Sequence, residues 1–308
     1  MSPPATPPGL GPHCVGRRVV VRRIVRGETG PTGGPAMTDL LGEMTSWTST
    51  DTTVRAEDGR EVSIPLADIV SGKPVPPRPS VRLRVTPREA HLRSLAMWPD
   101  LETEPLGQWL LRSSGPSGGR LVARANSALA MGDPGLLLDD AAARVIEFYA
   151  RRDRPAWVQV ESGGDLDRGL VDLGWRPARP GEADTSFEIA SVARVLRNLP
   201  GALRGPTRVS LEEQGPRLLA TMAGPDGPVA RGRAAVDGDW VGLHDLWTDP
   251  AYRRRGLSSS VVAHLLDAAA ATGATTAYLQ VRLDNPAALA LYEGLGFAPH
   301  HSYRYLTP

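Results

Sequence analysis

The stretch TDPAYRRRGLSSSVVAHLL, from Thr248 to Leu266, places three arginines directly before a glycine and an apolar run with helical spacing. The start of a surface helix usually carries acidic residues, because its free N–H groups bear partial positive charge. Arginines at this place suit an anion that is supplied from outside the chain and held by the helix start. The loop by itself is equally compatible with a solvated basic turn.

The flanking sequence predicts the elements on both sides of this loop. Residues 240–248 read as a strand, and residues 257–271 read as a helix that Gly273 ends. Gly256 would allow a ligand to approach the backbone closely, and the free N–H groups that follow it would face the mouth of the loop. A phosphate binds well at such a junction of a strand, a loop and a helix.

A weak internal repeat extends this pattern backwards along the chain. In the first copy, GDPG at Gly132 precedes a helical segment, the strand AWVQV and the turn GWRP; in the second, TDPA at Thr248 precedes a helical segment, AYLQV and GFAP. The first copy has Gly135 and three leucines where the second has its arginines, and Leu170 where the second has Tyr292. We therefore expect a structural first copy over residues 85–186 and an active second copy over residues 187–308.

Two motifs of the second copy resemble the GNAT superfamily of N-acetyltransferases. Arg253 to Ser258 follows its pattern Q/R-x-x-G-x-G/A, with Ser258 in place of the final Gly or Ala, and Asp284 to Phe297 is close to N-x-x-A-x-x-L-Y-x-x-x-G-F. The resemblance implies an α+β fold with a mixed sheet, a tandem GNAT-like acyl-CoA N-acyltransferase fold. It also implies acetyl-CoA as co-substrate.

The resemblance further implies which residues hold the acyl-CoA. Backbone groups of Leu246 and Thr248 would pair with the pantetheine arm as an added strand would. Asn285 would hydrogen-bond the cofactor, and its alternative role is to cap the following helix. The expected cofactor-binding set is Leu246, Trp247, Thr248, Arg253, Arg254, Arg255, Gly256, Leu257, Ser258, Ser259, Asn285, Ala288 and Tyr292.

Two residues are the candidates for catalysis. In this superfamily a tyrosine at the place of Tyr292 protonates the departing thiolate; the alternative is a tyrosine that only fills the core. His244 is the candidate general base for the amine, because regular alternation would put it on the strand face of Leu246 and Thr248. Its alternative is a structural histidine. The final HHSYRY, from His300 to Tyr305, reads as a last strand or as part of the acceptor site.

These features together predict an acetyl-CoA-dependent N-acetyltransferase whose primary amine attacks directly in a ternary complex. The acceptor stays open between a small molecule, an amino acid such as glutamate and a protein lysine. The alternative is a non-catalytic acyl-CoA-binding or scaffold module. Trp109, Phe148, Tyr149 and Trp175 of the first copy are expected in its core.

Composition limits the partners and the compartment. The 308 residues carry 35 basic and 34 acidic side chains, which gives no general case for nucleic acid or a membrane surface. The single cysteine, Cys14, allows no internal disulfide and no cysteine metal cluster, so we expect a cytoplasmic protein without a metal. The repeat can supply within one chain the sheet pairing that such folds make between subunits, so a monomer or a dimer is expected.

The N-terminal quarter is organised differently. Residues 1–13 are rich in Pro and Gly and are expected to be a disordered tail, residues 14–74 a small SH3-like β-barrel of four or five short strands, and residues 75–84 a proline-rich linker. The arginines of this barrel are expected on a solvated strand face, with nucleic-acid binding as the less favoured alternative; they are Arg17, Arg18, Arg22, Arg23 and Arg26.

Overall fold

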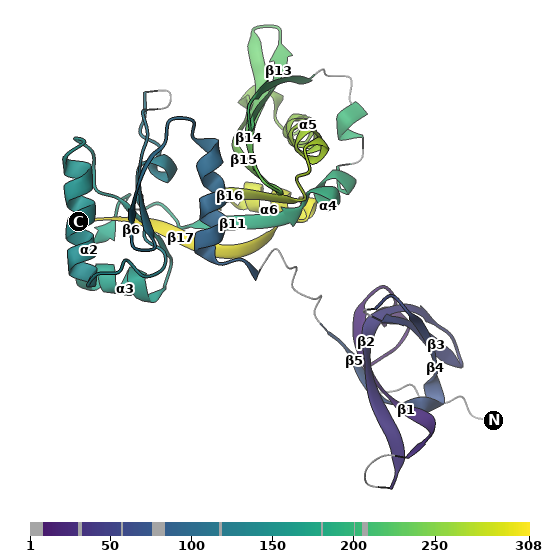
Figure 1. Cartoon of the computed structure of the whole chain (residues 1–308). Helices are drawn as coiled ribbons and strands as arrows, with labels where there is room; N and C mark the ends of the chain where they lie inside the picture. Colours follow the sequence, from purple (N-terminus) through teal and green to yellow (C-terminus); the bar gives the residue numbers. More distant parts are fainter. Residues whose placement is uncertain are drawn as a thin grey trace. The chain divides into compact units, whose positions relative to one another are not determined.

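The computed structural model describes residues 9–29, 33–56, 58–75, 84–116, 119–179, 181–199, 201–204 and 209–308. The chain divides into two compact units, residues 1–79 and 80–308 (Figure 1). Most of the expected linker, residues 76–83, lies outside the described residues.

The N-terminal unit is an antiparallel sheet of five strands in the order β4-β3-β2-β1-β5. Its strands confirm the expected count, although β1 and β2 are long, with 12 and 13 residues. Alternation along β1 buries Val19 and Val21 on the inner face. The elements are η1 (Pro12–Cys14), β1 (Arg18–Thr29), β2 (Pro35–Trp47), β3 (Asp51–Ala56), β4 (Glu61–Pro65), η2 (Leu66–Asp68) and β5 (Ile69–Pro74).

Part of the expected disordered tail is ordered. Leu10 and Cys14 are buried in the core of this unit, and a side chain on Gly72 would collide with the Leu10 side chain at 2.2 Å. A five-stranded sheet of this size buries little apolar surface on its own. An apolar residue just before the sheet therefore adds stability when it packs into the core. The prediction of disorder is therefore wrong for residues 9–13, and residues 1–8 lie outside the described residues.

Ion pairs occupy two of the exposed arginines of β1. Arg22 donates to Asp39 at 2.8 Å, and Arg26 lies 2.9 Å from Asp68. Exposed pairs of this kind contribute little to stability, because water and salt screen the two charges. Both pairs fit the expected solvated face.

The second unit contains one mixed sheet of 12 strands in the order β12-β13-β14-β15-β16-β11-β17-β9-β8-β7-β6, with β10 beside β17. Two of its pairs are parallel, β8 with β9 and β15 with β16. This confirms the expected α+β fold with a mixed sheet. The strands are β6 (Glu102–Leu106), β7 (Trp109–Ser113), β8 (Ala128–Leu129), β9 (Val158–Glu161), β10 (Arg176–Pro177), β11 (Thr185–Ser191), β12 (Val209–Gln214), β13 (Arg217–Gly224), β14 (Gly227–Asp237), β15 (Trp240–Thr248), β16 (Thr276–Arg282) and β17 (Ala298–Thr307).

The two copies of the repeat exchange their last strands within this sheet. β11, which ends the first copy, pairs with β16 of the second (Figure 1). β17, which ends the second copy, pairs with β9 of the first. β11 and β17 also pair with each other and form the join. The expected boundary at residues 186 and 187 falls inside β11, so the two copies share one continuous sheet.

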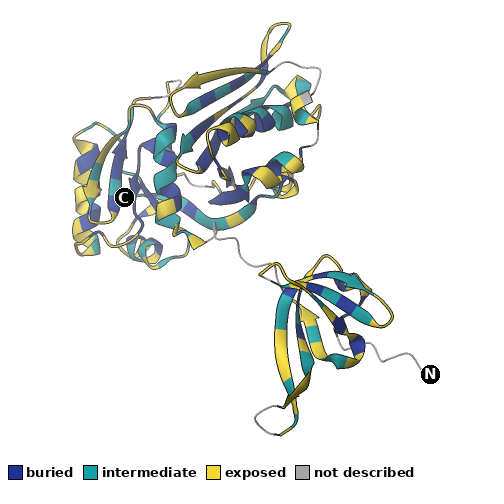
Figure 2. Cartoon of the chain, turned by 45° about the vertical axis from the view of Figure 1, so that its right-hand side comes forward, coloured by how far each residue is buried: buried dark blue, intermediate teal, exposed yellow. Residues whose placement is uncertain are grey.

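Helices cover the sheet in the same order in both copies, α2 and α3 in the first and α5 and α6 in the second. The inner face of α5 belongs to the core of the second copy, and its outer face is exposed (Figure 2). The four aromatic residues expected in the core of the first copy are all buried there. The helical elements are α1 (Pro87–Leu92), η4 (Arg93–Met97), η5 (Ala123–Ala125), α2 (Leu138–Ala150), α3 (Asp165–Asp172), α4 (Val192–Arg197), η6 (Ala202–Arg204), η7 (Pro250–Tyr252), α5 (Leu257–Ala271) and α6 (Pro286–Leu295).

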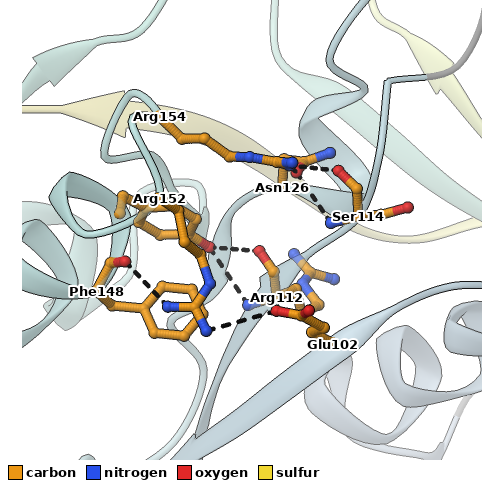
Figure 3. A network of polar contacts seen from close by, with 8 residues as sticks. Glu102, Arg112, Ser114, Asn126, Phe148, Arg152 and Arg154 are labelled. Atoms are coloured by element: carbon orange, nitrogen blue, oxygen red, sulfur yellow. Dashed lines mark hydrogen bonds and ion pairs between the residues drawn. The ribbon is translucent and has the colours of Figure 1, made fainter.

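A polar network inside the first copy ties its strands to α2 (Figure 3). The Tyr149 hydroxyl donates to the Arg112 carbonyl at 2.8 Å and accepts the Arg112 N–H at 3.3 Å. Arg154 donates to the Ser114 carbonyl and to the Asn126 side-chain oxygen. Asn126 directly follows η5, so the network fixes this short turn against the sheet.

Candidate active site

The two parallel strands β15 and β16 part in mid-sheet. They pair from Trp240 and Thr276 to Leu243 and Leu279, and no further, although β15 continues to Thr248 and β16 to Arg282. Beyond Leu243, the edge of β15 that faces β16 has no strand partner in this sheet. Its main-chain groups are therefore available to an extended ligand.

A β-bulge lies at the point where these strands part. Arg233 pairs with His244 and Arg231 with Trp247, so two residues of β15 oppose the single residue between the arginines on β14. Asp245 has a φ of 49°, in the left-handed region. Both arginines hold its carboxylate, Arg231 at 3.2 Å and Arg233 at 3.4 Å.

Because of the bulge, the side chains of His244 and Leu246 point to opposite faces of the sheet. A Cβ on Gly232 would come within 2.5 Å of the Leu246 side chain and 2.7 Å of Val261, so Leu246 points to α5. His244 points to the opposite side, where its ring lies 5.7 Å from that of Trp98. The expectation that His244 shares a face with Leu246 is therefore wrong, because the extra residue reverses the alternation.

The surroundings of His244 keep its imidazole neutral. Burial lowers the pKa of His244 to about 4; nearby Asp245 opposes this shift, and the positive charges of Arg124 and Arg233 add to it. The ring is therefore unprotonated at neutral pH. A neutral imidazole can accept a proton, which a general base requires.

The basic loop leads into a helix start without a cap. Gly256 adopts a φ of 76° at the N-cap of α5, no side chain caps the helix, and its first turn contains no acidic residue. Arg253 and Arg255 donate only to nearby main-chain carbonyls, Arg253 to Thr248 at 3.4 Å and Arg255 to Ala251 at 3.3 Å. Within the described part of the chain, none of the three arginines forms an ion pair. Leu257, Ser258 and Ser259 occupy the first turn, where the backbone N–H groups have no partner within the helix.

The motif on α6 contributes a cap and a half-buried tyrosine. The Asn285 side chain accepts the Ala288 N–H at 3.2 Å, which confirms its capping role. Ala288 and Tyr292 pack against the same core cluster as Leu246 and Leu257, so they lie on the α5 side of the sheet. Burial raises the pKa of Tyr292 to about 12, so its hydroxyl keeps its proton.

The first copy brings two further residues to the site, Trp98 after η4 and Arg124 on η5. The Trp98 ring lies tilted beside the ring of His244, and Arg124 donates to the Gln280 carbonyl of β16 at 3.4 Å. Sequence reasoning missed both, because neither belongs to a motif. It also missed Glu188, a buried carboxyl whose pKa burial raises and which accepts the Ser186 hydroxyl at 2.5 Å.

In the first copy, the position that corresponds to the basic loop and the start of α5 carries acidic instead of basic side chains. A cavity of about 440 Å³ opens there beyond the ends of β8 and β9, and its lining includes Met131, Glu161 and Asp165. The helix α2, which matches α5, has two acidic residues in its first turn, Asp139 and Asp140. Acidic side chains at this helix start would repel a phosphate.

No described helix is long and apolar enough to cross a membrane. Among the described side chains, no group of three or more His, Cys, Asp or Glu residues could hold a metal ion.

Comparison with known proteins identifies relatives of both units. One family model, the Rv0428c N-terminal Sm-like domain, matches residues 13–73, and another, the C-terminal part of the probable histone acetyltransferase Rv0428c, matches residues 207–306. The Sm-like description leaves the SH3-like assignment of this unit a prediction. A GCN5-related N-acetyltransferase of Kribbella flavida superposes with a TM-score of 0.54 at 17% identity, over 75% of this chain and 96% of its own, which shows the fold.

Two curated relatives are similar in sequence. The [ribosomal protein bS18]-alanine N-acetyltransferase of Escherichia coli is 44% identical over 59 residues, which are 19% of this chain and only 40% of that relative. The probable histone acetyltransferase Rv0428c of Mycobacterium tuberculosis is 30% identical over 97% of this chain and 95% of its own length. Because this second match spans nearly both chains, the protein belongs to the Rv0428c family, whose members join an Sm-like N-terminal domain to a GNAT acetyltransferase fold.

Proposed function

We propose that this protein is an acetyl-CoA-dependent N-acetyltransferase that transfers the acetyl group to a primary amine by direct attack in a ternary complex. The observation that carries the proposal is the divergence of β15 and β16 in front of an uncapped helix start with three unpaired arginines. The two curated relatives are described as a [ribosomal protein bS18]-alanine N-acetyltransferase and as a probable histone acetyltransferase. Their activities support the reaction class for this chain.

The described residues fit acetyl-CoA. The uncapped N–H groups of α5 and the side chains of Arg253 to Arg255 would hold its diphosphate. The free edge of β15 at Leu246 and Thr248 would pair with the pantetheine arm. The Thr248 hydroxyl is buried without a hydrogen-bond partner, which suits a ligand that supplies one. When bound, acetyl-CoA supplies an acetyl group activated as a thioester.

The two catalytic candidates lie on opposite faces of the sheet, which suits a reaction carried out in the gap between β15 and β16. His244 lies on the side of Trp98 and accepts a proton from the attacking amine. Tyr292 lies on the α5 side and donates its proton to the departing sulfur. Main-chain N–H groups at the bulge would stabilise the negative charge on the carbonyl oxygen.

The amine nitrogen forms a bond to the carbonyl carbon, and the carbon–sulfur bond breaks. His244 takes the proton that the nitrogen loses, and the thiolate receives the proton of Tyr292, which leaves an amide and free coenzyme A. Proton exchange with solvent restores both side chains. Cys14 is free and buried in the core of the N-terminal unit, which supports a route without an acyl-cysteine. A free thiol also supports a reducing, cytoplasmic compartment.

Removal of the Tyr292 hydroxyl tests this function. In Tyr292→Phe we expect kcat to fall by roughly 10²- to 10⁴-fold, the usual contribution of a positioned proton donor, with unchanged affinity for acetyl-CoA. Steady-state acetyl transfer to an amine panel and calorimetric titration measure the two quantities. Tyr278→Phe is the matched control, because its hydroxyl is buried without a partner and lies outside the proposed machinery.

Two results would contradict the proposal. Equal kcat in Tyr292→Phe and Tyr278→Phe would show that Tyr292 is not the proton donor. Tight binding of acetyl-CoA without transfer to any amine would instead favour the non-catalytic binding module.

A further inference from the structure

Hydrogen bonds link three histidines in a row beside the join between the two copies. The Nε2 atom of His91, on α1, lies 3.0 Å from the Nε2 atom of His301 on β17. The Nδ1 atom of His301 lies 2.7 Å from the Nδ1 atom of His300, whose Nε2 atom lies 2.8 Å from the Val85 carbonyl oxygen. This histidine chain, formed by His91, His301 and His300, ties α1 and Val85 to β17, one of the two joining strands.

A buried arginine of the first copy fixes the other end of the histidine chain. Arg112, on β7, is only 1% exposed, and its Nη2 atom donates to the side-chain oxygen of Gln159 at 2.6 Å. Because a guanidinium can only donate, the Gln159 oxygen faces Arg112 and the amide nitrogen faces His91. That nitrogen lies 3.2 Å from Nδ1 and 3.3 Å from Nε2 of His91, and Nε2 is the atom that faces His301. Nδ1 of His91 therefore accepts from Gln159 and carries no hydrogen.

The partners at its two ends assign the ring hydrogens of the histidine chain, and the two assignments agree. From the Gln159 end, a neutral His91 donates its Nε2 hydrogen to Nε2 of His301, which leaves the hydrogen of His301 on Nδ1. From the Val85 end, the carbonyl only accepts, so His300 carries its hydrogen on Nε2 and accepts from His301 at Nδ1. Three neutral rings thus supply one hydrogen to each contact. A second proton on any ring would place two hydrogens in one contact.

The surroundings of the histidine chain oppose a second proton. Burial lowers the pKa of His91 well below its ordinary value, and the positive charges of its neighbours add to this shift. These neighbours are His301, Arg112, Arg124 and His300. Burial, with His300 as the lesser cause, lowers the pKa of His301 to about 3. Both rings are therefore neutral at neutral pH, as the hydrogen bonds require.

The other titratable groups on the elements packed against the chain are paired, exposed or neutral. Those with partners are Glu89 with the Thr86 N–H, Arg88 with the Gln108 carbonyl, Arg93 with Asp237 and Tyr303 with Gln280. On β9, Glu161 is exposed. Burial raises the pKa of Tyr305 well above its ordinary value, so this phenol is neutral. Among the described residues, no hydrogen bond joins a carboxylate to His91 or His301.

We propose that the histidine chain is an acid-sensitive lock, which holds α1 on β17 while its rings are neutral and releases α1 when His91 or His301 takes up a second proton. A guanidinium keeps its charge in proteins, so Arg112 prevents the chain from reversing its direction to accommodate that proton. η4 follows α1 directly and ends one residue before Trp98, whose ring lies 5.7 Å from that of His244. An open lock therefore also loosens one side of the candidate active site. The lock itself does not depend on the proposed acetyl transfer.

The sign and the size of the pH effect follow from the two states of the lock. Once α1 is released, the rings of His91 and His301 reach water and regain an ordinary pKa of about 6.5. The closed form, in which the pKa of both rings is lowered, takes up no proton on them at pH 5. Acid therefore favours the open form. Between pH 7 and pH 5, each ring raises the opening constant about 25-fold, and the two rings together raise it about 600-fold.

Hydrogen exchange in the full-length protein measures this opening. Exchange of residues 86–98, which span α1 and η4, is followed by mass spectrometry at pH 7 and pH 5 and corrected for the intrinsic rate at each pH. We expect the protection factor of this segment to fall about 600-fold at pH 5. We also expect it to lie below that of residues 257–271 on α5 at both pH values, because α1 opens without the rest of the unit.

Glutamine variants identify the rings that cause the effect. His91→Gln and His301→Gln each remove one titrating ring and keep an amide that donates and accepts, so each should reduce the fall to about 25-fold. The double variant should abolish it. His264→Gln is the matched control, because His264 lies on α5 and contacts the Ser260 carbonyl of its own helix at 2.8 Å. This control should keep the full fall of the parent.

Nitrogen-15 NMR of the imidazoles gives a second reading on the parent, which holds even if a variant does not fold. At pH 6 we expect a single hydrogen on each ring, on Nε2 of His91, Nδ1 of His301 and Nε2 of His300. A doubly protonated His91 or His301 at pH 6 would overturn the proposal. So would an equal protection factor of residues 86–98 at both pH values, an equal fall in the parent and the double variant, or one common protection factor for residues 86–98 and 257–271.

Discussion

Asp245 is the residue on which the geometry of the site depends most. Its left-handed backbone and its two arginine partners hold the bulge that turns His244 away from Leu246. The sequence marks His244 as a candidate, but the regular alternation assumed for the strand placed it on the wrong face. A bulge at a non-glycine residue depends on long-range pairing with β14, so it leaves no local signal in the sequence.

The lowered pKa of His244 predicts the pH dependence of transfer. An imidazole of pKa about 4 remains about 90% neutral at pH 5, whereas one of ordinary pKa about 6.5 would be only about 3% neutral there. We therefore expect kcat/KM, corrected for the protonated fraction of the amine substrate, to stay flat from pH 7 to pH 5. A measured loss by half near pH 6.5 would show that His244 titrates normally or is not the base.

The start of α5 is the element that the sequence predicts best. Its arginines, its glycine and the following helix are close in sequence, so local rules place them correctly. The pairing of the strands near α5 could not be predicted in the same way. That β11 lies beside β16 depends on contacts between residues far apart in the chain, which no local pattern encodes.

A single charge at this helix start should change stability and binding in opposite directions. In Ser258→Asp, the new carboxylate meets the partial positive charge of the helix start and should add about 0.3–1 kcal/mol to the free energy of unfolding. The same carboxylate should repel the diphosphate and weaken acetyl-CoA binding at least about fivefold. Thermal unfolding and calorimetry measure the two effects, with Ser258→Asn as the uncharged control. A variant that binds as tightly as the parent would place the diphosphate elsewhere.

At the scale of the whole molecule, the sequence repeat predicts two copies of one pattern but not how they are joined. The exchange of β11 and β17 makes one sheet of the two halves, so the first copy supports the site of the second directly. It contributes Trp98 and Arg124 to that site. The first copy, which has no basic loop at the start of α2, thus supplies part of the surroundings of the candidate site in the second copy.

Calorimetric titration with acetyl-CoA tests the central claim, that only the second copy binds the cofactor. Gly256→Asp and Gly135→Asp are matched variants, because both glycines have a positive φ, 76° and 71°, and a similar position in their copies. We expect one acetyl-CoA per chain for the parent, loss of binding in Gly256→Asp and unchanged binding in Gly135→Asp. Two bound molecules per chain, or loss of binding only in Gly135→Asp, would contradict it.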